Sequence, residues 1–312
     1  MYTEQLYKII LKEIKIEYDQ FTKIIEDLMK YNILQYEIDN SISSEMELYS
    51  RQIEFWESFF NINDGEIFQK NLTDKHLVIV GCGGLGSWIS VYLAQIGFKH
   101  LTIIDSDKVE LSNLTRQILF DVSDIGKPKV DSMKKKLENL NPYLNIETLE
   151  TTLTEECVVF KEIHSKKSID MIINCADEPS VVEVSKWIND FCYIENIPFL
   201  VGGGYTGHSS KIGTIINPGT TPSWLDYINS TNKLEGTQKF NILREAEYKY
   251  KGVLNLTASL AAIVQTMDIV KFFSGMKEPM MKSKTAELDI DSFEIDYVYF
   301  EKEVGDEYEE KL

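Results

Sequence analysis

One stretch, HLVIVGCGGLGSWISVYLAQIGFKHLTIID over residues 76–105, constrains the fold of this 312-residue chain more than any other. It begins with a short β-branched run typical of a buried strand. Glycines then follow in GxGxxG spacing, after which apolar residues recur at helical spacing and a second apolar run ends in Asp105. The glycines of the turn are Gly81, Gly83, Gly84 and Gly86. This order predicts a nucleotide-binding unit within a Rossmann-like, doubly wound α/β fold.

The chemistry of such a turn is specific. Glycines let the backbone approach a phosphate, and the N-terminus of the following helix offers N–H groups and partial positive charge. The carboxylate of Asp105, about twenty residues after the glycines, suits the ribose hydroxyls. A purely structural tight turn is the alternative interpretation, and it does not account for the strand, the helix and the acid together.

The segment after Asp105 carries an unusual density of polar and basic side chains. The candidate nucleotide-binding residues in it are Asp107, Asn113, Arg116, Gln117, Lys127 and Lys129. A dehydrogenase has no use for such a cluster, whereas chemistry at a triphosphate needs Arg and Lys to neutralise the phosphoryl oxygens. The cluster therefore favours ATP over NAD as the nucleotide.

Composition narrows the partners. The formal net charge of −18 argues against nucleic acid and anionic membranes. No apolar run approaches the roughly 20 residues that span a bilayer, and the N-terminus lacks a signal-peptide pattern, so we expect a cytoplasmic protein. The four cysteines are scattered and form no CxxC pair, which indicates neither a disulfide framework nor a four-thiolate zinc site.

Residues 1–48 differ in character from the rest of the chain. We expect helical segments over residues 2–16 and 18–34, a strand over 33–38 and a polar linker over 39–48. Two helices and a strand at this size suggest a small α+β, winged-helix-like module that holds a peptide by strand addition. A helical dimerisation arm or a simple cap remains an equal alternative. Residues 49–312 then form the main domain.

Several ordered motifs resemble the adenylating domain of the ThiF/MoeB superfamily, the prokaryotic relatives of ubiquitin-activating enzymes. They are YSRQ, GCGGLG, IIDSDKVELSNLTRQILF, DIGKPKVDSMKKKL, IDMIINCADEPS and GVLNLTASLAAIVQTMDIVKFFSG, and they span residues 49–275. The N-terminal module and the pair NLTRQILF and DIGKPK give the closest likeness to the peptide-modifying branch typified by MccB and PaaA.

The resemblance implies a mechanism. Arg51, from the neighbouring subunit of a homodimer, would act with Arg116 and Lys129 on the ATP phosphates, and Asp177 would hold Mg²⁺. Asn113 and Gln117 would position phosphates or the substrate. A helix N-cap or a turn carboxylate is the alternative role for Asp177, because Glu178-Pro179 follows it. No cysteine lies where thioester-forming relatives carry one, so the acyl adenylate would pass directly to a nucleophile of the substrate.

One departure from the family concerns zinc. Relatives carry two CxxC pairs that bind structural zinc, but the first pair is replaced here by Ser223-Trp224-Leu225-Asp226 and the tail has no cysteine. We therefore expect no structural zinc, and a tail held by an alternating strand of Phe293, Ile295, Tyr297 and Tyr299.

Three functions remain open at this point. The favoured one is ATP-dependent adenylation of the carboxyl or C-terminal amide of a ribosomally made precursor peptide, or alternatively of a small ubiquitin-fold sulfur carrier. The second is a non-catalytic scaffold that binds a leader peptide. The third is an NAD-dependent oxidoreductase, which would leave the basic cluster unexplained.

Overall fold

The computed structural model describes residues 7–8, 12, 15–31, 44–206, 208–234 and 252–301. By its contacts the chain divides into two compact units, residues 1–47 and residues 48–312. In the first unit, α2 (Tyr18–Lys30) buries Phe21, whose ring lies 5.1 Å from that of Tyr7. The helix predicted over 18–34 thus ends at Lys30, and the predicted strand over 33–38 lies outside the described residues. The peptide-holding character of this unit stays a prediction.

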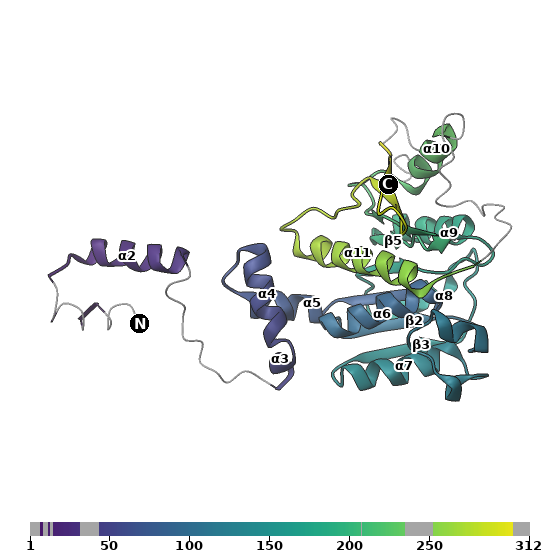
Figure 1. Cartoon of the computed structure of the whole chain (residues 1–312), viewed down its shortest axis with the longest axis horizontal. Coiled ribbons are helices and arrows are strands. Elements are labelled where there is room, and N and C mark those ends of the chain that lie inside the picture. The colour runs from purple at the N-terminus through teal and green to yellow at the C-terminus, as the bar shows by residue number, and fades with distance from the viewer. Residues whose placement is uncertain are drawn as a thin grey trace. The chain divides into compact units, whose positions relative to one another are not determined.

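The second unit is built on a six-stranded sheet in the order β3-β2-β1-β4-β5-β8 (Figure 1). Its strands are β1 (His76–Val80), β2 (His100–Ile104), β3 (Asn145–Leu149), β4 (Met171–Asn174), β5 (Phe199–Val201) and β8 (Ile215–Ile216). All neighbours pair in parallel except β5 and β8. The predicted Rossmann-like fold is confirmed. Strands β2 and β3 are added on one side of β1, and β4 and β5 on the other, so the topological switch point lies between β1 and β4. Folds of this type bind ligands at that point.

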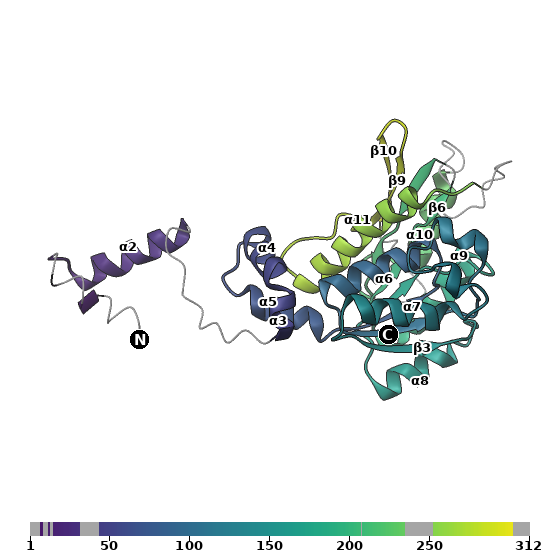
Figure 2. The same cartoon turned by 60° about the horizontal axis from the view of Figure 1, so that its bottom comes forward.

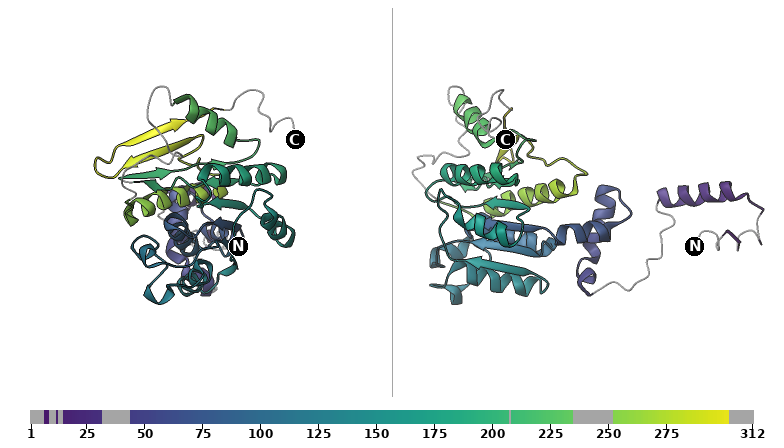
Figure 3. Two further views of the ribbon diagram at one scale, coloured as in Figure 1. Left: turned by 90° about the vertical axis from the view of Figure 1, so that its right-hand side faces the viewer. Right: turned by 180° about the vertical axis from the view of Figure 1, so that it is seen from behind.

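Helices cover both faces of this sheet, as Figures 1 and 3 show. The helices of the unit are α4 (Ser50–Phe60), α5 (Gly65–Thr73), α6 (Gly84–Ile96), α7 (Lys129–Leu140), α8 (Val158–Lys166), α9 (Val181–Glu195), α10 (Trp224–Leu234) and α11 (Asn255–Ser274). Short 3-10 helices are η1 (Leu111–Thr115) and η2 (Val122–Asp124). In β1, Leu77 and Ile79 enter the core on the α6 and α11 side, whereas Val78 and Val80 enter the core on the α8 and α9 side. This explains why the strand is apolar throughout.

A second sheet of four antiparallel strands has the order β10-β9-β7-β6. Its strands are β6 (Tyr205–Thr206), β7 (Ser209–Ile212), β9 (Lys284–Asp289) and β10 (Ile295–Tyr299). Ile212 and Ala286 pack with Val264 of α11, and Figure 2 shows the β9–β10 hairpin projecting beyond that helix.

The structure corrects the expected packing of the tail. The predicted strand forms as β10, but Phe293, Ile295, Tyr297 and Tyr299 are exposed. The opposite face is buried through Val298 and Phe300, and the ring of Phe300 stands 5.0 Å from that of Tyr227 in α10. The alternation therefore predicted the strand correctly and the buried face wrongly.

Tyr227 belongs to α10, which begins within Ser223-Trp224-Leu225-Asp226, the segment expected to stand in place of a zinc-binding cysteine pair. There Ser223 donates its N–H and its hydroxyl to Asp226 Oδ2 at 2.7 and 2.9 Å, and its Oγ accepts the Asp226 N–H at 3.1 Å. The Ser-x-x-Asp sequence that replaces the cysteine pair thus forms a reciprocal cap at the start of α10. Among the described residues, no group of three metal-ligating side chains comes together.

Two further expectations need correction. Residues 44–48, predicted as linker, form the short helix α3 (Ser44–Leu48). By length and composition α11 is apolar enough to cross a membrane, contrary to the expectation that no run approaches that length. Its Ala258, Ala261 and Ala262 are fully buried, and it packs along α6 and β7, so the position of α11 is that of a core helix.

Candidate active site

The glycine turn connects β1 to α6 at the carboxyl edge of the parallel sheet. Gly81 has φ +96° and donates its N–H to Ile104 O at 2.8 Å. A Cβ on Gly86 would stand 1.9 Å from Gly81 O, and one on Gly81 would stand 2.8 Å from Ala176 N. These two glycines therefore permit a close approach of backbone that any side chain would prevent.

Gly83 has a different position in the same turn. It is the N-cap of α6, no side chain caps that helix end, and a Cβ on it would meet nothing within 4 Å. The first N–H groups of α6, beginning with Gly84, are thus left without a side-chain acceptor at an open place. This is the arrangement that binds phosphate at helix N-termini.

Asp105 follows β2 and is fixed against the glycine turn. Its Oδ2 accepts the N–H of Cys82 at 2.6 Å, and its Oδ1 accepts the N–H of Asp107 at 2.7 Å. Each carboxylate oxygen keeps a second lone pair for another donor. The carboxylate is consequently rigid and still able to accept hydrogen bonds from a ligand.

Lys129 is brought to the same edge as the first residue of α7. Its Nζ lies 2.7 Å from Asp107 Oδ2, and its N–H donates to Asp107 O at 2.9 Å. The lysine side chain is 8% exposed while that of Asp107 is 57% exposed. The structure therefore holds one buried ammonium beside an open carboxylate. Lys127, by contrast, is paired with Asp124 at 3.5 Å.

The 3-10 helix η1 and the two residues after it include the remaining predicted nucleotide ligands. Asn113 is buried, and its Oδ1 accepts the N–H of Glu110 at 3.0 Å, so its role in the structure is to fold this turn. Gln117 is 3% exposed and its Oε1 has no partner among the described residues. Arg116 is half-buried, with Nη1 donating to Ser112 O at 2.8 Å. A buried amide oxygen without a partner is a candidate ligand contact.

Asp177 lies in the loop after β4, at the same edge of the sheet. Its side chain is exposed. It is not the N-cap of α9, because Ser180 has that role and accepts the Glu183 N–H at 3.1 Å. The alternative of a helix-capping role for Asp177 is therefore wrong, and the carboxylate is free of that task.

Arg51 is the one predicted catalytic residue that lies away from this edge. Its neighbour Gln52 donates to Gln95 O at 2.8 Å, near the C-terminal end of α6. The glycine turn lies at the N-terminal end of the same helix. The 13 residues of α6 separate the two by about 18 Å, farther than an arginine side chain extends. Arg51 is 88% exposed and contacts Glu54 on its own helix at 3.2 Å.

The four thiols of the chain are all poor nucleophiles. Burial raises the pKa of Cys82, and the carboxylate of Asp105 raises it further. Burial likewise raises the pKa of Cys157, Cys175 and Cys192. A thiol with a raised pKa carries little thiolate near neutral pH. None of the four is suited to take up an acyl group.

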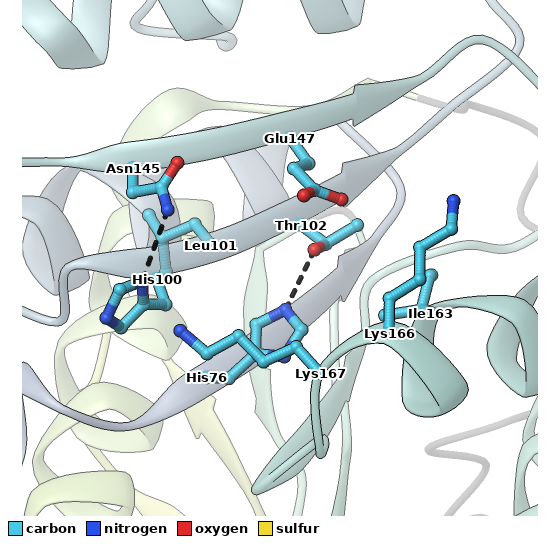
Figure 4. A pocket seen from close by; sticks show the side chains of 9 residues that line it. All are labelled: His76, His100, Leu101, Thr102, Asn145, Glu147, Ile163, Lys166 and Lys167. Carbon is cyan, nitrogen blue, oxygen red and sulfur yellow. Dashed lines mark hydrogen bonds between the residues drawn. The ribbon is translucent and has the colours of Figure 1, made fainter.

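A cavity at the opposite edge of the sheet is a separate feature (Figure 4). His76 and His100 begin β1 and β2, and they line it with Thr102 and Lys167. His76 Nε2 lies 2.8 Å from Thr102 Oγ1, and Nδ1 lies 3.1 Å from Ser168 O. The volume of about 30 Å³ is that of about one water molecule, too small for a nucleotide.

Two buried amides that support the site escaped the sequence interpretation. Asn174 ends β4 and bonds both Ser185 and Ala176. Gln265 of α11, with its amide oxygen turned toward the sheet, accepts the N–H groups of Gly203 at 3.2 Å and Gly213 at 3.1 Å. Each is a polar residue within an otherwise apolar run, and that signal was available in the sequence.

Comparison with known proteins agrees with this geometry. The ThiF family model matches residues 49–305. The molybdopterin-synthase adenylyltransferase of Haemophilus influenzae is 32% identical over 231 residues, which is 74% of this chain and 85% of that protein. The sulfur carrier protein ThiS adenylyltransferase of Escherichia coli is 29% identical, over 68% of this chain and 77% of that protein.

Solved structures show the same fold. The E. coli MccB structure with ATP superposes with a TM-score of 0.70 at 24% identity, covering 95% of this chain and 83% of that chain. The PaaA structure superposes with a TM-score of 0.71 at 23% identity, covering 95% of this chain and 87% of that chain.

Proposed function

This chain belongs to the ThiF family and is an ATP-dependent adenylyltransferase; we propose that its substrate is a ribosomally made precursor peptide. The carboxyl or the C-terminal amide of that peptide would be activated during maturation of a natural product. The observation that carries this choice is a separate N-terminal unit that precedes the family-matched residues. The MccB and PaaA structures each align with 95% of this chain, so the aligned part must include some of this N-terminal unit.

The residues present fit ATP. The open space at Gly83 and the uncapped N-terminus of α6 suit phosphate oxygens. In the proposal Asp105 accepts from the ribose hydroxyls, and the orphaned oxygen of Gln117 accepts from the nucleotide or from the substrate. Asn113 contributes by holding η1 in shape.

The reaction joins a substrate oxygen to the α-phosphorus of ATP. The bond from that phosphorus to the bridging oxygen breaks, and pyrophosphate leaves with the electron pair. The ammonium of Lys129 and the guanidinium of Arg116 offset the negative charge that gathers on the phosphoryl oxygens. Asp107 keeps the ammonium in place through their 2.7 Å contact. Removing one such positive group costs roughly 10²–10³ in rate.

Asp177 is the proposed ligand of Mg²⁺. It is exposed at the carboxyl edge and is spared the capping role that Ser180 fills. Mg²⁺ in such sites takes one or two carboxylates and completes its shell with phosphate oxygens and water, so a single protein carboxylate suffices. When bound, the ion neutralises phosphate charge.

The acyl adenylate would pass to a nucleophile outside this chain. Burial raises the pKa of all four cysteines, which leaves little thiolate near neutral pH to form a thioester. An amide or amine of the peptide itself is the natural acceptor, and for a sulfur carrier the acceptor would be a separate sulfur donor.

The active unit in this proposal is a homodimer in which Arg51 acts in the partner's site. Arg51 cannot reach the glycine turn of its own subunit, because the two lie at opposite ends of the 13-residue helix α6. A cavity of about 280 Å³ opens beside it, lined by Gln52, Tyr92, Gln95, Ile96, Ile263, Thr266 and Met267. Ile263 of α11, in that lining, is 51% exposed. An exposed apolar surface beside an arginine that cannot reach its own active site supports a homodimer with two-fold symmetry.

The alternative substrate is a small ubiquitin-fold sulfur carrier, which the names of the two adenylyltransferases compared above favour. A non-catalytic leader-binding scaffold would need none of Lys129, Arg116 and Asp177. Their presence together at one edge of the sheet counts against it.

Pyrophosphate exchange separates these possibilities. The protein is incubated with ATP, Mg²⁺ and labelled pyrophosphate, together with either a candidate precursor peptide or a ubiquitin-fold protein ending in Gly-Gly. Label should enter ATP only with the peptide. Exchange only with the ubiquitin-fold protein would replace the proposed substrate, and ATP binding with no exchange under either condition would favour the scaffold.

A further inference from the structure

The loop that carries Asp177 is anchored by a pair of buried polar side chains, Asn174 and Ser185. Asn174 is 1% exposed at the end of β4, and Ser185 is fully buried in α9. Asn174 Nδ2 donates to Ser185 Oγ at 2.9 Å, and Asn174 Oδ1 accepts the N–H of Ala176 at 3.1 Å. One amide therefore joins the helix behind the sheet to the backbone one residue before Asp177.

The backbone around this amide is held on both sides. Cys175 N–H donates to Val80 O of β1 at 2.7 Å, and Gly202 N–H donates to Asn174 O at 2.8 Å. On the site side, the loop lies against Gly81, where an added Cβ would be 2.8 Å from Ala176 N. The loop is thus wedged between the glycine turn and the Asn174–Ser185 pair, and a shift of either would move the residue that comes next.

We propose that the Asn174–Ser185 pair positions the Asp177 carboxylate for the metal-bound nucleotide. This rests on the proposed function, because it assigns the pair to the metal-binding carboxylate. Asp177 itself projects into solvent, so its placement has to come from the backbone that precedes it. Supporting residues of this kind act on metal affinity without touching the ion.

The chemistry of the pair predicts a distinctive order among substitutions. Ser185→Ala leaves the buried Nδ2 of Asn174 without an acceptor, and Asn174→Ala also removes the acceptor for Ala176 N–H. Asn174→Asp keeps both contacts, because a carboxylate accepts from the Ser185 hydroxyl and from the Ala176 N–H. That variant buries a charge, so it should unfold at a lower temperature and yet keep the loop in place.

The test measures Mn²⁺ binding by electron paramagnetic resonance, on the full chain with a non-hydrolysable ATP analogue. Each variant is accompanied by its melting temperature and by its affinity for the analogue in EDTA. Ser185→Ala and Asn174→Ala should weaken Mn²⁺ binding by roughly 10–100-fold, with metal-free nucleotide affinity close to the wild type. Asn174→Asp should bind Mn²⁺ as tightly as the wild type despite its lower melting temperature.

Ser90→Ala is the matched control. Ser90 is a fully buried helical serine whose Oγ has no partner among the described residues. Removing its hydroxyl should therefore leave the Mn²⁺ affinity and the metal-free nucleotide affinity unchanged. The proposal is overturned if Mn²⁺ affinity follows melting temperature across all variants, Asn174→Asp included, or if Ser185→Ala and Asn174→Ala leave Mn²⁺ affinity unchanged. Wild-type protein that binds no Mn²⁺ with the analogue would instead refute the proposed function, and this proposal with it.

Discussion

Replacing Gly86 with alanine separates the structural task of the glycine turn from its ligand-binding task. The added Cβ would stand 1.9 Å from Gly81 O and 3.3 Å from Cys175 Cβ. The first neighbour is backbone, so the turn or α6 must shift by about 1 Å to restore contact distance. Overpacking of this kind costs about 1–3 kcal/mol, while alanine regains up to about 1 kcal/mol of helix propensity.

A net loss of about 1–2 kcal/mol lowers the melting temperature of a domain of this size by about 2–8 °C. ATP affinity should fall as well, because the shifted atoms belong to the turn that we propose holds the phosphates. Gly83→Ala is the control: its Cβ meets nothing within 4 Å and φ is −71°, so the melting temperature should hold while ATP affinity falls. Calorimetry and nucleotide titration measure both. The reasoning fails if Gly86→Ala is as stable as the wild type, or if Gly83→Ala binds ATP normally.

The same geometry predicts four further outcomes. Asp177→Ala should abolish pyrophosphate exchange with an unchanged melting temperature; exchange at the wild-type rate would remove the magnesium assignment. Equal mixtures of inactive Arg51→Ala and inactive Asp177→Ala subunits should recover about a quarter of the activity, because half the dimers are mixed and each has one intact site; no recovery would argue against the trans arrangement. Burial lowers the pKa of His76 from 6.5. As the pH falls, His76 therefore takes up a proton in the unfolded chain before it does so in the folded chain, and stability should fall below about pH 6.5. Urea unfolding at about pH 7.5 and about pH 5.5 should show this loss, and His76→Gln should reduce it; an equal loss in the variant would assign it elsewhere. Phe300→Ala should cost about 3–5 kcal/mol in the same assay, whereas exposed Phe293→Ala should cost under about 0.5 kcal/mol; similar costs would contradict the observed tail packing.

Much of the nucleotide side of the site was predictable from sequence. In a parallel sheet the residues that come after successive strands meet at one edge, so the glycines after β1, Asp105 after β2 and Asp177 after β4 had to gather there. Lys129 joins them because the chain returns to Asp107 before α7 begins. Local order along the chain, read together with one topological rule, was enough.

The features that sequence did not predict depend on contacts between distant segments. Which face of β10 is buried depends on Tyr227 in α10. The face that packs through Val298 and Phe300 also carries Asp296, so the alternation of apolar residues pointed to the opposite face. The pairing of Asn174 with Ser185 joins a strand to a helix, so neither residue stands out by itself. The helix that ends the predicted linker, Ser44–Leu48, begins in a polar stretch that composition assigned to loop.

The distance between Arg51 and its own glycine turn is of the same kind. The YSRQ motif and the glycine turn lie about thirty residues apart in the sequence, and only the packing of α4 against the far end of α6 separates them in space.

The central claim is that this chain activates a peptide terminus with ATP, and pyrophosphate exchange tests it most directly. A candidate precursor peptide should stimulate incorporation of labelled pyrophosphate into ATP, and the same peptide should give none with Asp177→Ala. Exchange that depends on a ubiquitin-fold protein and ignores every peptide would contradict the claim.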